Sequence, residues 1–228
     1  MRRNNNKESF WPSYVDIVTT LFAIMVVLFA VSYSRFRINE IELKKVVDKY
    51  EEIKSIYKVV ENIDSTYFEF NPQYVKHIFK IQVTYQRGEF NLNKLQADIY
   101  DKAEADSLRK DIKKAGEVIK STIDKLQQDQ STKQDIKYLV VIEGQASADG
   151  YDIDDYYNNN VLSYQRALSL HEFWKDSAKI DFSSMPKCEL VISGSGEGGV
   201  PRDTVDEVNN QRFLIHIVPV IGNIHMEE

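Results

Sequence analysis

The chain has 228 residues, 43% hydrophobic and 28% charged, so it is long enough to bury one core and a smaller second unit. Nine Gly and five Pro exclude a low-complexity or collagen-like chain, and the single Cys188 excludes an intramolecular disulfide and a cysteine-based zinc site. The formal net charge of -6 argues against the broad basic face that duplex nucleic acid requires, so we expect no nucleic-acid partner.

Near the N-terminus, residues 14–33 form an apolar run in which residues 17–31 contain no charge, Gly or Pro. Twenty helical residues cover roughly 30 Å, the thickness of a bilayer hydrocarbon core. The aromatic residues Trp11, Tyr14 and Tyr33 flank the run, where interfacial side chains belong. The pattern predicts a transmembrane helix over residues 13–34, after a short segment of residues 1–12.

A secretory signal peptide and a buried helix of a soluble core are the alternatives to a transmembrane helix. A secretory signal peptide would also show a basic start and a small-residue site such as Ala30-Val31-Ser32, but this run is long and carries an acid near its start. A buried helix of a soluble core would show a polar face, which is lacking. Basic residues lie on both sides of the run, so charge counting does not determine its orientation.

Asp16 is the one carboxylate of the apolar run. It can be an acid that the helix dipole favours in the first turns. Alternatively it is an ion carrier, because an intramembrane carboxylate costs several kcal/mol unless paired, protonated or hydrated. Thr19 and Thr20 share its helical face and are expected to line the ion path.

Residues 37–62 show a heptad pattern, which predicts a helical linker over residues 35–63 that can form a coiled coil. Its two seam positions are occupied by Leu43, Tyr50 and Tyr57 and by Val46, Ile53 and Val60. Such a repeat favours a parallel helical pair, and hence a homodimer. The alternative is one amphipathic helix lying on its own domain.

The rest of the chain, residues 64–228, alternates strands and helices. Strands are predicted over residues 66–70, 77–86, 136–143, 189–193 and 212–220, helices over residues 103–127 and 161–174, a turn at residues 87–89, and loops over residues 144–160 and 194–210. This order predicts an α/β sandwich, in which helices cover one face of a small mixed sheet.

The chemistry of an enzyme is not supported. Residues 194–199 match the letters of G-x-G-x-x-G, but Pro201 and a polar loop follow where a dinucleotide site needs a helix. The acidic loop lacks the glycine and terminal Glu of an EF-hand, and its members are Asp149, Asp152, Asp154 and Asp155. The four His residues lie far apart. We expect no catalytic residues, no metal site and no cofactor.

Four spaced motifs lie between residues 144 and 213. They are Gly144-Gln145-Ala146-Ser147, then Asn159-x-x-Leu162-Ser163-x-x-Arg166-Ala167, then Gly194-x-Gly196-Glu197-x-x-x-Pro201, and Asn210-Gln211-Arg212-Phe213. The series resembles the OmpA-like peptidoglycan-binding domain, with its pattern G-H-T-D, N-x-x-L-S-x-x-R-A, G-x-G-E and N-R-R-V. In that family, the helix Arg and the Asp of T-D bind the diaminopimelate end of a stem peptide.

The resemblance implies peptidoglycan-binding residues in this chain. They are Arg166, Asn159, Ser163, Ser147, Asp149, Asn210 and Arg212. Ser147 stands where the family has Asp, and Asp149, two residues further on, is expected to reach the ligand ammonium. The alternative is an OmpA-like fold retained as a dimeric or protein-binding module.

The N-terminal half extends the resemblance. Phe10-Trp11-Pro12-Ser13-Tyr14-Val15-Asp16 at the start of a single span, followed by a helical linker and an OmpA-like domain, resembles the B subunits of ion-driven stator motors. These are MotB of flagella and ZorB of the Zorya antiphage system, and the W-P-S-Y-V-D sequence is nearer the Zorya type.

That resemblance implies a location and partners. In those families two B chains pass through a pentamer of A subunits (MotA or ZorA), the acid matching Asp16 carries H⁺ or Na⁺, and peptidoglycan holds the B dimer. The implied protein lies in the bacterial inner membrane, with a cytoplasmic N-terminus and a periplasmic C-terminal domain. The competing function is a non-conducting tether of the cell envelope.

Overall fold

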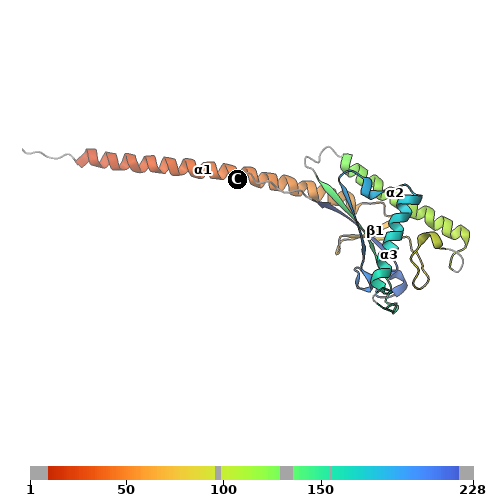
Figure 1. Cartoon of the computed structure of the whole chain (residues 1–228). Coiled ribbons are helices and arrows are strands. Elements are labelled where there is room, and N and C mark those ends of the chain that lie inside the picture. Colours follow the sequence, from red (N-terminus) through yellow and green to blue (C-terminus); the bar gives the residue numbers. More distant parts are fainter. Residues whose placement is uncertain (1–9, 96–98, 129–135, 155, 221–228) are drawn as a thin grey trace, which may run out of the picture. The chain divides into compact units, whose positions relative to one another are not determined.

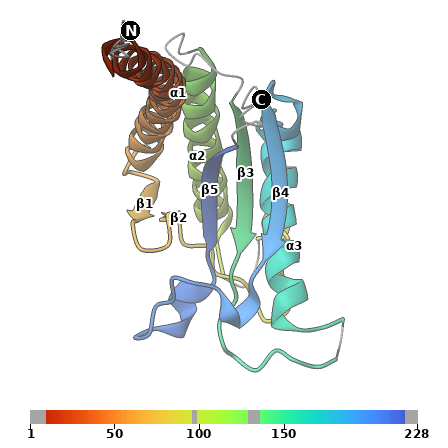
Figure 2. The ribbon, with the colours of Figure 1, turned by 90° about the vertical axis from the view of Figure 1, so that its left-hand side faces the viewer.

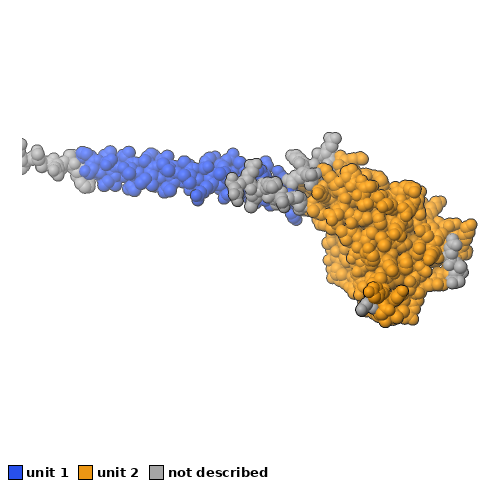
Figure 3. Space-filling model, in the orientation of Figure 1, with its two compact units in different colours: residues 1–51, 226–228 blue, residues 52–225 orange. Residues whose placement is uncertain are grey.

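The computed structural model of the protein describes residues 10–95, 99–128, 136–154 and 156–220. It contains two compact units, of which the first ends at Glu51 and the second begins at Glu52 (Figure 3). Most of the predicted cytoplasmic segment, and Asp155 of the acidic loop, lie outside the described residues.

The first unit consists of most of helix α1, which spans Phe10–Glu61 (Figure 1). The predicted span of residues 13–34 and the predicted linker up to Glu61 form one unbroken helix, and the last two linker residues follow its end. Its most apolar 18-residue window has a mean hydropathy of 2.4, and the large hydrophobic side chains along it are exposed. By length and composition, α1 can cross a membrane.

The last turns of α1 belong to the core of the second unit. Ile56 and Val60 are buried there together with Ile63, and the Val60 carbonyl lies 2.8 Å from Nε2 of His77. Of the predicted heptad seam, Leu43 and Tyr50 are exposed, whereas Val60 packs into its own domain. The alternative of a helix lying on its own domain therefore holds for the C-terminal end of the seam.

The second unit is built around a five-stranded mixed sheet with the order β1-β2-β5-β3-β4. Its strands are β1 (Phe68–Asn71), β2 (Lys76–Phe79), β3 (Lys137–Gly144), β4 (Cys188–Gly194) and β5 (Phe213–Val220). All neighbouring strands pair antiparallel except β3 and β4, which are parallel. A helical crossover must connect such a parallel pair, and helix α3 (Asn159–Glu172) supplies it.

Helices α2 (Lys102–Gln128) and α3 cover the same face of this sheet (Figure 2). Helix α2 presents buried residues at helical spacing, including Ile112, Ile119 and Ile123, to a core that also contains Val140 and Ile142 of β3. The fold is therefore the predicted one, a mixed α/β domain with helices on one face of a small sheet and a long apolar helix before it.

Most predicted elements are present with shifted ends. The helix predicted over residues 103–127 is α2, and the one predicted over residues 161–174 is α3 followed by a π-helical turn, Phe173–Ser177. Helix α3 begins earlier than predicted because the side chain of Asn158 accepts a hydrogen bond from the Val161 N–H and caps the helix.

The strand predicted over residues 77–86 is wrong beyond Phe79. Its alternating pattern is real, since Val83 and Tyr85 are buried in the core, but the segment is not paired as a strand in the sheet. Instead, the Thr84 N–H donates to the Tyr100 hydroxyl at 2.8 Å. Alternating apolar residues indicate that every second side chain is buried, and an extended segment can show this without pairing in a sheet.

Candidate functional site

The four spaced motifs of the sequence meet at the carboxyl end of β3. The Gln145 N–H donates to the Arg212 carbonyl at 2.9 Å, and the Ala146 N–H donates to the Gly196 carbonyl at 3.0 Å. The Gly196 N–H in turn donates to the Ser163 hydroxyl at 2.9 Å. These bonds join the end of β3, the first turns of α3 and both ends of the loop between β4 and β5.

Two glycines let α3 approach the strands closely. A Cβ atom on Gly144 would lie 2.0 Å from the Ser163 carbonyl oxygen, and one on Gly194 would lie 2.4 Å from the Tyr164 nitrogen. Gly196 has a positive φ of 55°, which favours glycine. The G-x-G letters are thus explained by helix packing, and a short 3₁₀ turn, Gly196–Gly198, follows them in place of a dinucleotide-binding helix.

Arg166 of α3 is the central charged group of this region. Its side chain is almost completely buried, with the residue 3% exposed. The guanidinium carbon lies 4.5 Å from the ring centroid of Tyr85, and Nε donates to the Glu89 carbonyl at 3.2 Å. Burial lowers the pKa of Arg166, while the nearby charges of Tyr85, Asp149 and Glu89 act in the opposite direction. The Tyr85 ring and the Glu89 carbonyl thus fix the orientation of the positively charged guanidinium.

Asp149 and Ser147 lie on the loop between β3 and α3 and are linked to each other. The Ser147 hydroxyl donates to the Asp149 carboxylate at 3.2 Å, and it accepts a bond of 3.0 Å from Nε2 of Gln211. The other Asp149 oxygen accepts the Tyr151 N–H at 3.1 Å. The carboxylate is therefore held in place, and its negative charge acts on Arg166. The region thus contains one guanidinium and one carboxylate whose charges act on each other.

Some polar atoms near this site are buried without a partner. Among the described residues, the side-chain oxygen and nitrogen of Asn159 and the side-chain oxygen of Gln211 make no hydrogen bond. A buried polar group without a partner is costly, and such groups often contact a ligand or water. The side-chain amide of Asn159, one of the predicted binding residues, can therefore still donate and accept hydrogen bonds.

The remaining predicted residues have partners within the chain. The Ser163 hydroxyl donates to the Asn160 carbonyl at 2.8 Å. Asn210 exchanges two hydrogen bonds with the backbone of Asp203, and Arg212 donates to the Gln145 side chain at 3.0 Å and to the Pro201 carbonyl at 2.8 Å. These bonds hold the 194–212 loop, and a contact of these residues with peptidoglycan stays a prediction.

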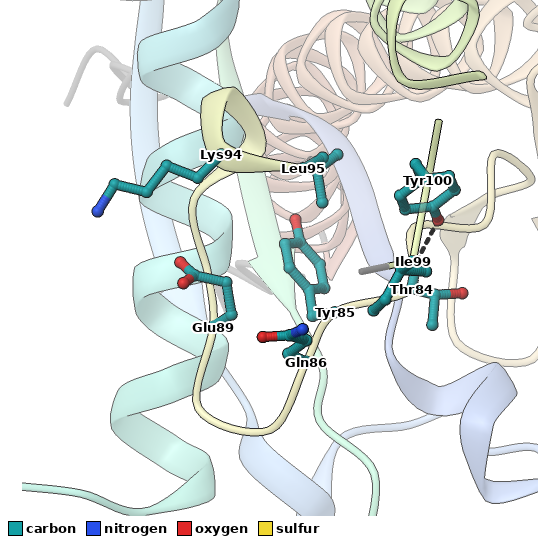
Figure 4. A pocket seen from close by; sticks show the side chains of 8 residues that line it. All are labelled: Thr84, Tyr85, Gln86, Glu89, Lys94, Leu95, Ile99 and Tyr100. Carbon is teal, nitrogen blue, oxygen red and sulfur yellow. Dashed lines mark hydrogen bonds between the residues drawn. The ribbon is translucent and has the colours of Figure 1, made fainter. Parts of the chain in front are cut away.

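Tyr85 and Glu89, which contact Arg166, belong to none of the sequence motifs. They lie about 80 residues before it in the chain, outside the four motifs. Both also line a pocket of about 50 Å³, with Gln86, Lys94 and Tyr100 on its other sides (Figure 4). The buried Tyr85 hydroxyl makes no hydrogen bond within the described part of the chain. The pocket holds at most a few waters and is too small for a nucleotide or sugar.

The predicted ion-carrying residue lies in the first unit. Asp16 is on the exposed, apolar part of α1. The hydroxyls of Thr19 and Thr20 donate to the carbonyls of Val15 and Asp16, at 2.7 and 2.8 Å. The threonine donors are therefore directed to the backbone of the helix. Within the described residues, no group of three or more His, Cys, Asp or Glu side chains could hold a metal ion.

No protein-family model and no curated protein matches the sequence. Among solved structures, the chain is similar to a MotB-like protein from Desulfovibrio vulgaris, with 17% identity and a TM-score of 0.40, over 77% of this chain and 91% of that chain. It is also similar to the cell wall anchor of the T6SS from Pseudomonas aeruginosa, with 10% identity and a TM-score of 0.38, over 72% and 94% of the two chains. Because these TM-scores are low, the proposal below is based on the residues of the two sites.

Proposed function

We propose that this chain is a B-type subunit of an ion-driven stator motor, with one transmembrane helix and a C-terminal domain that binds peptidoglycan. Asp16 carries the transported H⁺ or Na⁺, and the domain holds the subunit stationary against the cell wall. The observation that carries the proposal is a carboxylate, Asp16, within the apolar part of α1.

Asp16 needs a partner in the membrane. A carboxylate within a membrane helix is costly unless it is paired, protonated or hydrated, and Asp16 lies near the start of the predicted span. The hydroxyls of Thr19 and Thr20 donate to backbone carbonyls, so they leave the carboxylate to be hydrated or enclosed by other helices. A MotA- or ZorA-like A subunit would supply those helices, and a second copy of this chain would complete a homodimer.

The second unit offers a site of matching chemistry for a stem peptide. The diaminopimelate end of such a peptide carries both an ammonium and a carboxylate. Arg166 suits the carboxylate, and Asp149, held by Ser147 and by the Tyr151 N–H, suits the ammonium. Asp149 thus replaces the family Asp whose place Ser147 occupies. Asn159 adds buried polar atoms that have no partner within the described residues.

The proposed topology follows from this division of roles. A wall-binding domain must face the periplasm, so the N-terminus lies in the cytoplasm and the helix crosses the bacterial inner membrane. The Trp11-Pro12-Ser13-Tyr14-Val15-Asp16 sequence favours a Zorya-type antiphage motor over a flagellar one.

The test of the proposal is ion flux through vesicles that contain this chain and its A-type partner. Asp16→Asn is expected to abolish partner-dependent flux while expression and membrane insertion remain, because the amide can neither exchange a proton nor balance a cation. Asp16→Glu is expected to retain part of the flux.

The matched control is Asp48→Asn, which removes an exposed carboxylate from α1 outside the apolar run. It should conduct like the unmodified chain. If Asp16→Asn also conducts normally, Asp16 is not the carrier. If the unmodified chain shows no partner-dependent flux at all, the chain is better described as a non-conducting envelope tether.

A further inference from the structure

The loop between Asp149 and α3 exposes three large apolar or aromatic side chains. Ile153 is 70% exposed, Tyr156 80% and Tyr157 59%. Single exposed hydrophobic residues are ordinary, but several within five positions of one loop are a feature of interaction surfaces. We call Ile153, Tyr156 and Tyr157 the aromatic loop.

Hydrogen bonds hold the backbone of the aromatic loop in a defined turn. One Asp154 oxygen accepts the N–H groups of Tyr156 and Tyr157, at 2.7 and 2.9 Å. The Ile153 N–H donates to the Tyr157 carbonyl at 2.8 Å. These bonds restrain the backbone at Ile153, Tyr156 and Tyr157, so less conformational entropy is lost when a partner binds.

The aromatic loop is continuous with the site around Arg166. The residues just before the aromatic loop contact the segment that carries Tyr85 and Glu89: Arg87 donates to the Gly150 carbonyl at 3.1 Å and lies 5.9 Å from the Tyr151 ring centroid. The Tyr151 ring also lies over Gly88, where an added Cβ would be 2.9 Å from its hydroxyl. A ligand held by Arg166 and Asp149 would therefore extend toward this loop.

The composition of the loop indicates what such a ligand is. Asp149, Asp152 and Asp154 give the loop a negative charge, which opposes anionic lipid headgroups and nucleic acid. Tyrosine rings offer an apolar face for the C–H groups of a sugar and a hydroxyl for hydrogen bonds to it. In peptidoglycan, the stem peptide is covalently attached to a glycan strand, so a surface beside a stem-peptide site meets sugars.

We infer that Tyr156 and Tyr157 form a platform for the glycan strand of peptidoglycan, next to the stem-peptide site at Arg166 and Asp149. This inference rests on the proposed wall-binding function and extends it from the peptide to the sugar. The platform adds a second contact to the same polymer, which raises the overall affinity for the intact wall.

The test uses the full chain in detergent and its sedimentation with purified cell-wall sacculi. The double variant Tyr156→Ala/Tyr157→Ala is expected to weaken this binding about tenfold, because two exposed stacking rings are lost. The matched control is Tyr74→Ala, which removes an exposed tyrosine from the turn between β1 and β2. The control should sediment like the unmodified chain.

Two smaller ligands separate this inference from the proposed function. Oligosaccharides of N-acetylglucosamine, a glycan stripped of both peptide and carboxylates, should bind the unmodified chain and Arg166→Ala, but not the double tyrosine variant. A free diaminopimelate-containing peptide should bind the double tyrosine variant normally and Arg166→Ala weakly.

The outcomes are distinct. If the double tyrosine variant binds sacculi as the unmodified chain does while Arg166→Ala does not, the glycan platform is wrong and the wall-binding function stands. The same conclusion follows if the unmodified chain binds the peptide but not the stripped glycan. If the unmodified chain binds none of these ligands, both the platform and the wall-binding function are wrong.

Discussion

At the scale of single residues, Gly194 determines how closely α3 packs on the sheet. A methyl group there would lie 2.4 Å from the Tyr164 nitrogen and 2.7 Å from the Ser163 hydroxyl oxygen. Neither the helix backbone nor a hydroxyl that bonds Gly196 can move away cheaply. The first turns of α3 also carry Asn159, so this packing positions the candidate wall-binding site.

We therefore expect Gly194→Ala to destabilise the second unit by about 1 to 3 kcal/mol, the usual range for overpacking. The matched control is Gly198→Ala in the following turn, where an added Cβ meets nothing within 4 Å. Chemical unfolding of the full chain in detergent, followed by circular dichroism, measures both. Equal midpoints for the two variants would show that α3 can shift without cost.

Glu143 is a second residue with a large energetic role, on the opposite face of the sheet from α2 and α3. Its side chain is 8% exposed and accepts bonds of 2.9 Å from Lys76 and 2.8 Å from His216. Burial by itself raises the pKa of Glu143, but the hydrogen bonds from His216, Lys76 and Ser195 outweigh it and lower the pKa to about 2.

Because this folded-state pKa lies below the ordinary value of 4.5, ionised Glu143 stabilises the fold above pH 4.5. The contribution is about 3 kcal/mol and is lost as the pH falls from 4.5 toward 2. We expect Glu143→Gln to lower stability at pH 7 and to show a smaller loss between pH 5 and pH 3 than the unmodified chain.

The measurement is the unfolding midpoint of the full chain as a function of pH. The control is Glu189→Gln, which removes an exposed carboxylate from the neighbouring strand β4. This variant should lose as much stability between pH 5 and pH 3 as the unmodified chain does. If the unfolding midpoint of Glu143→Gln depends on pH as that of the unmodified chain does, the pKa of Glu143 is not lowered in the folded state.

At the scale of elements, helix α1 combines two kinds of surface. Its apolar residues near the N-terminus are exposed, as are the seam residues Leu43, Val46 and Tyr50. Its last turns instead bury Ile56 and Val60 in the core of the second unit. A helical pair between two copies is therefore expected over residues 43–50. The pairing must end before residue 56, because Ile56 is buried in the core of the second unit.

Single cysteines along α1 test this expectation. Substitutions at positions 43, 46 and 50 should cross-link between copies, and those at the intervening positions 44 and 48 should cross-link less. A cysteine at position 60 is the control, since Val60 is buried in its own domain. Burial raises the pKa of native Cys188 to about 11, so this thiol reacts slowly near neutral pH. Uniform cross-linking at all positions would contradict a seam.

At the scale of the whole molecule, the two proposed activities lie in different compact units. Asp16 is in the first unit, and Arg166 with Asp149 is in the second. Helix α1 contributes residues to both units, so the segment proposed to carry the ion and the domain proposed to bind the wall share one continuous backbone. Such a connection is what a subunit needs if it is to stay stationary while a partner moves around it.

The sequence by itself determined the apolar helix, the α/β class and the approximate positions of α2, β3 and α3. These depend on periodicity, which is a local property: strong 3.6-residue or alternating burial is visible in a short window. The extended segment after Phe79 shows the limit of such patterns. Its alternation matched a strand, yet pairing also requires a neighbouring strand, which no local pattern can supply.

Only the tertiary structure decided what surrounds Arg166. The motifs identified the arginine, but its partners Tyr85 and Glu89 come from a segment about 80 residues earlier. The structure likewise brought Asp149 near enough for its charge to act on Arg166, and it buried Val60 in the domain core. The physical reason is that contacts between distant segments depend on how the helices and strands pack together, and packing selects partners by shape and charge across the fold rather than by spacing in the sequence.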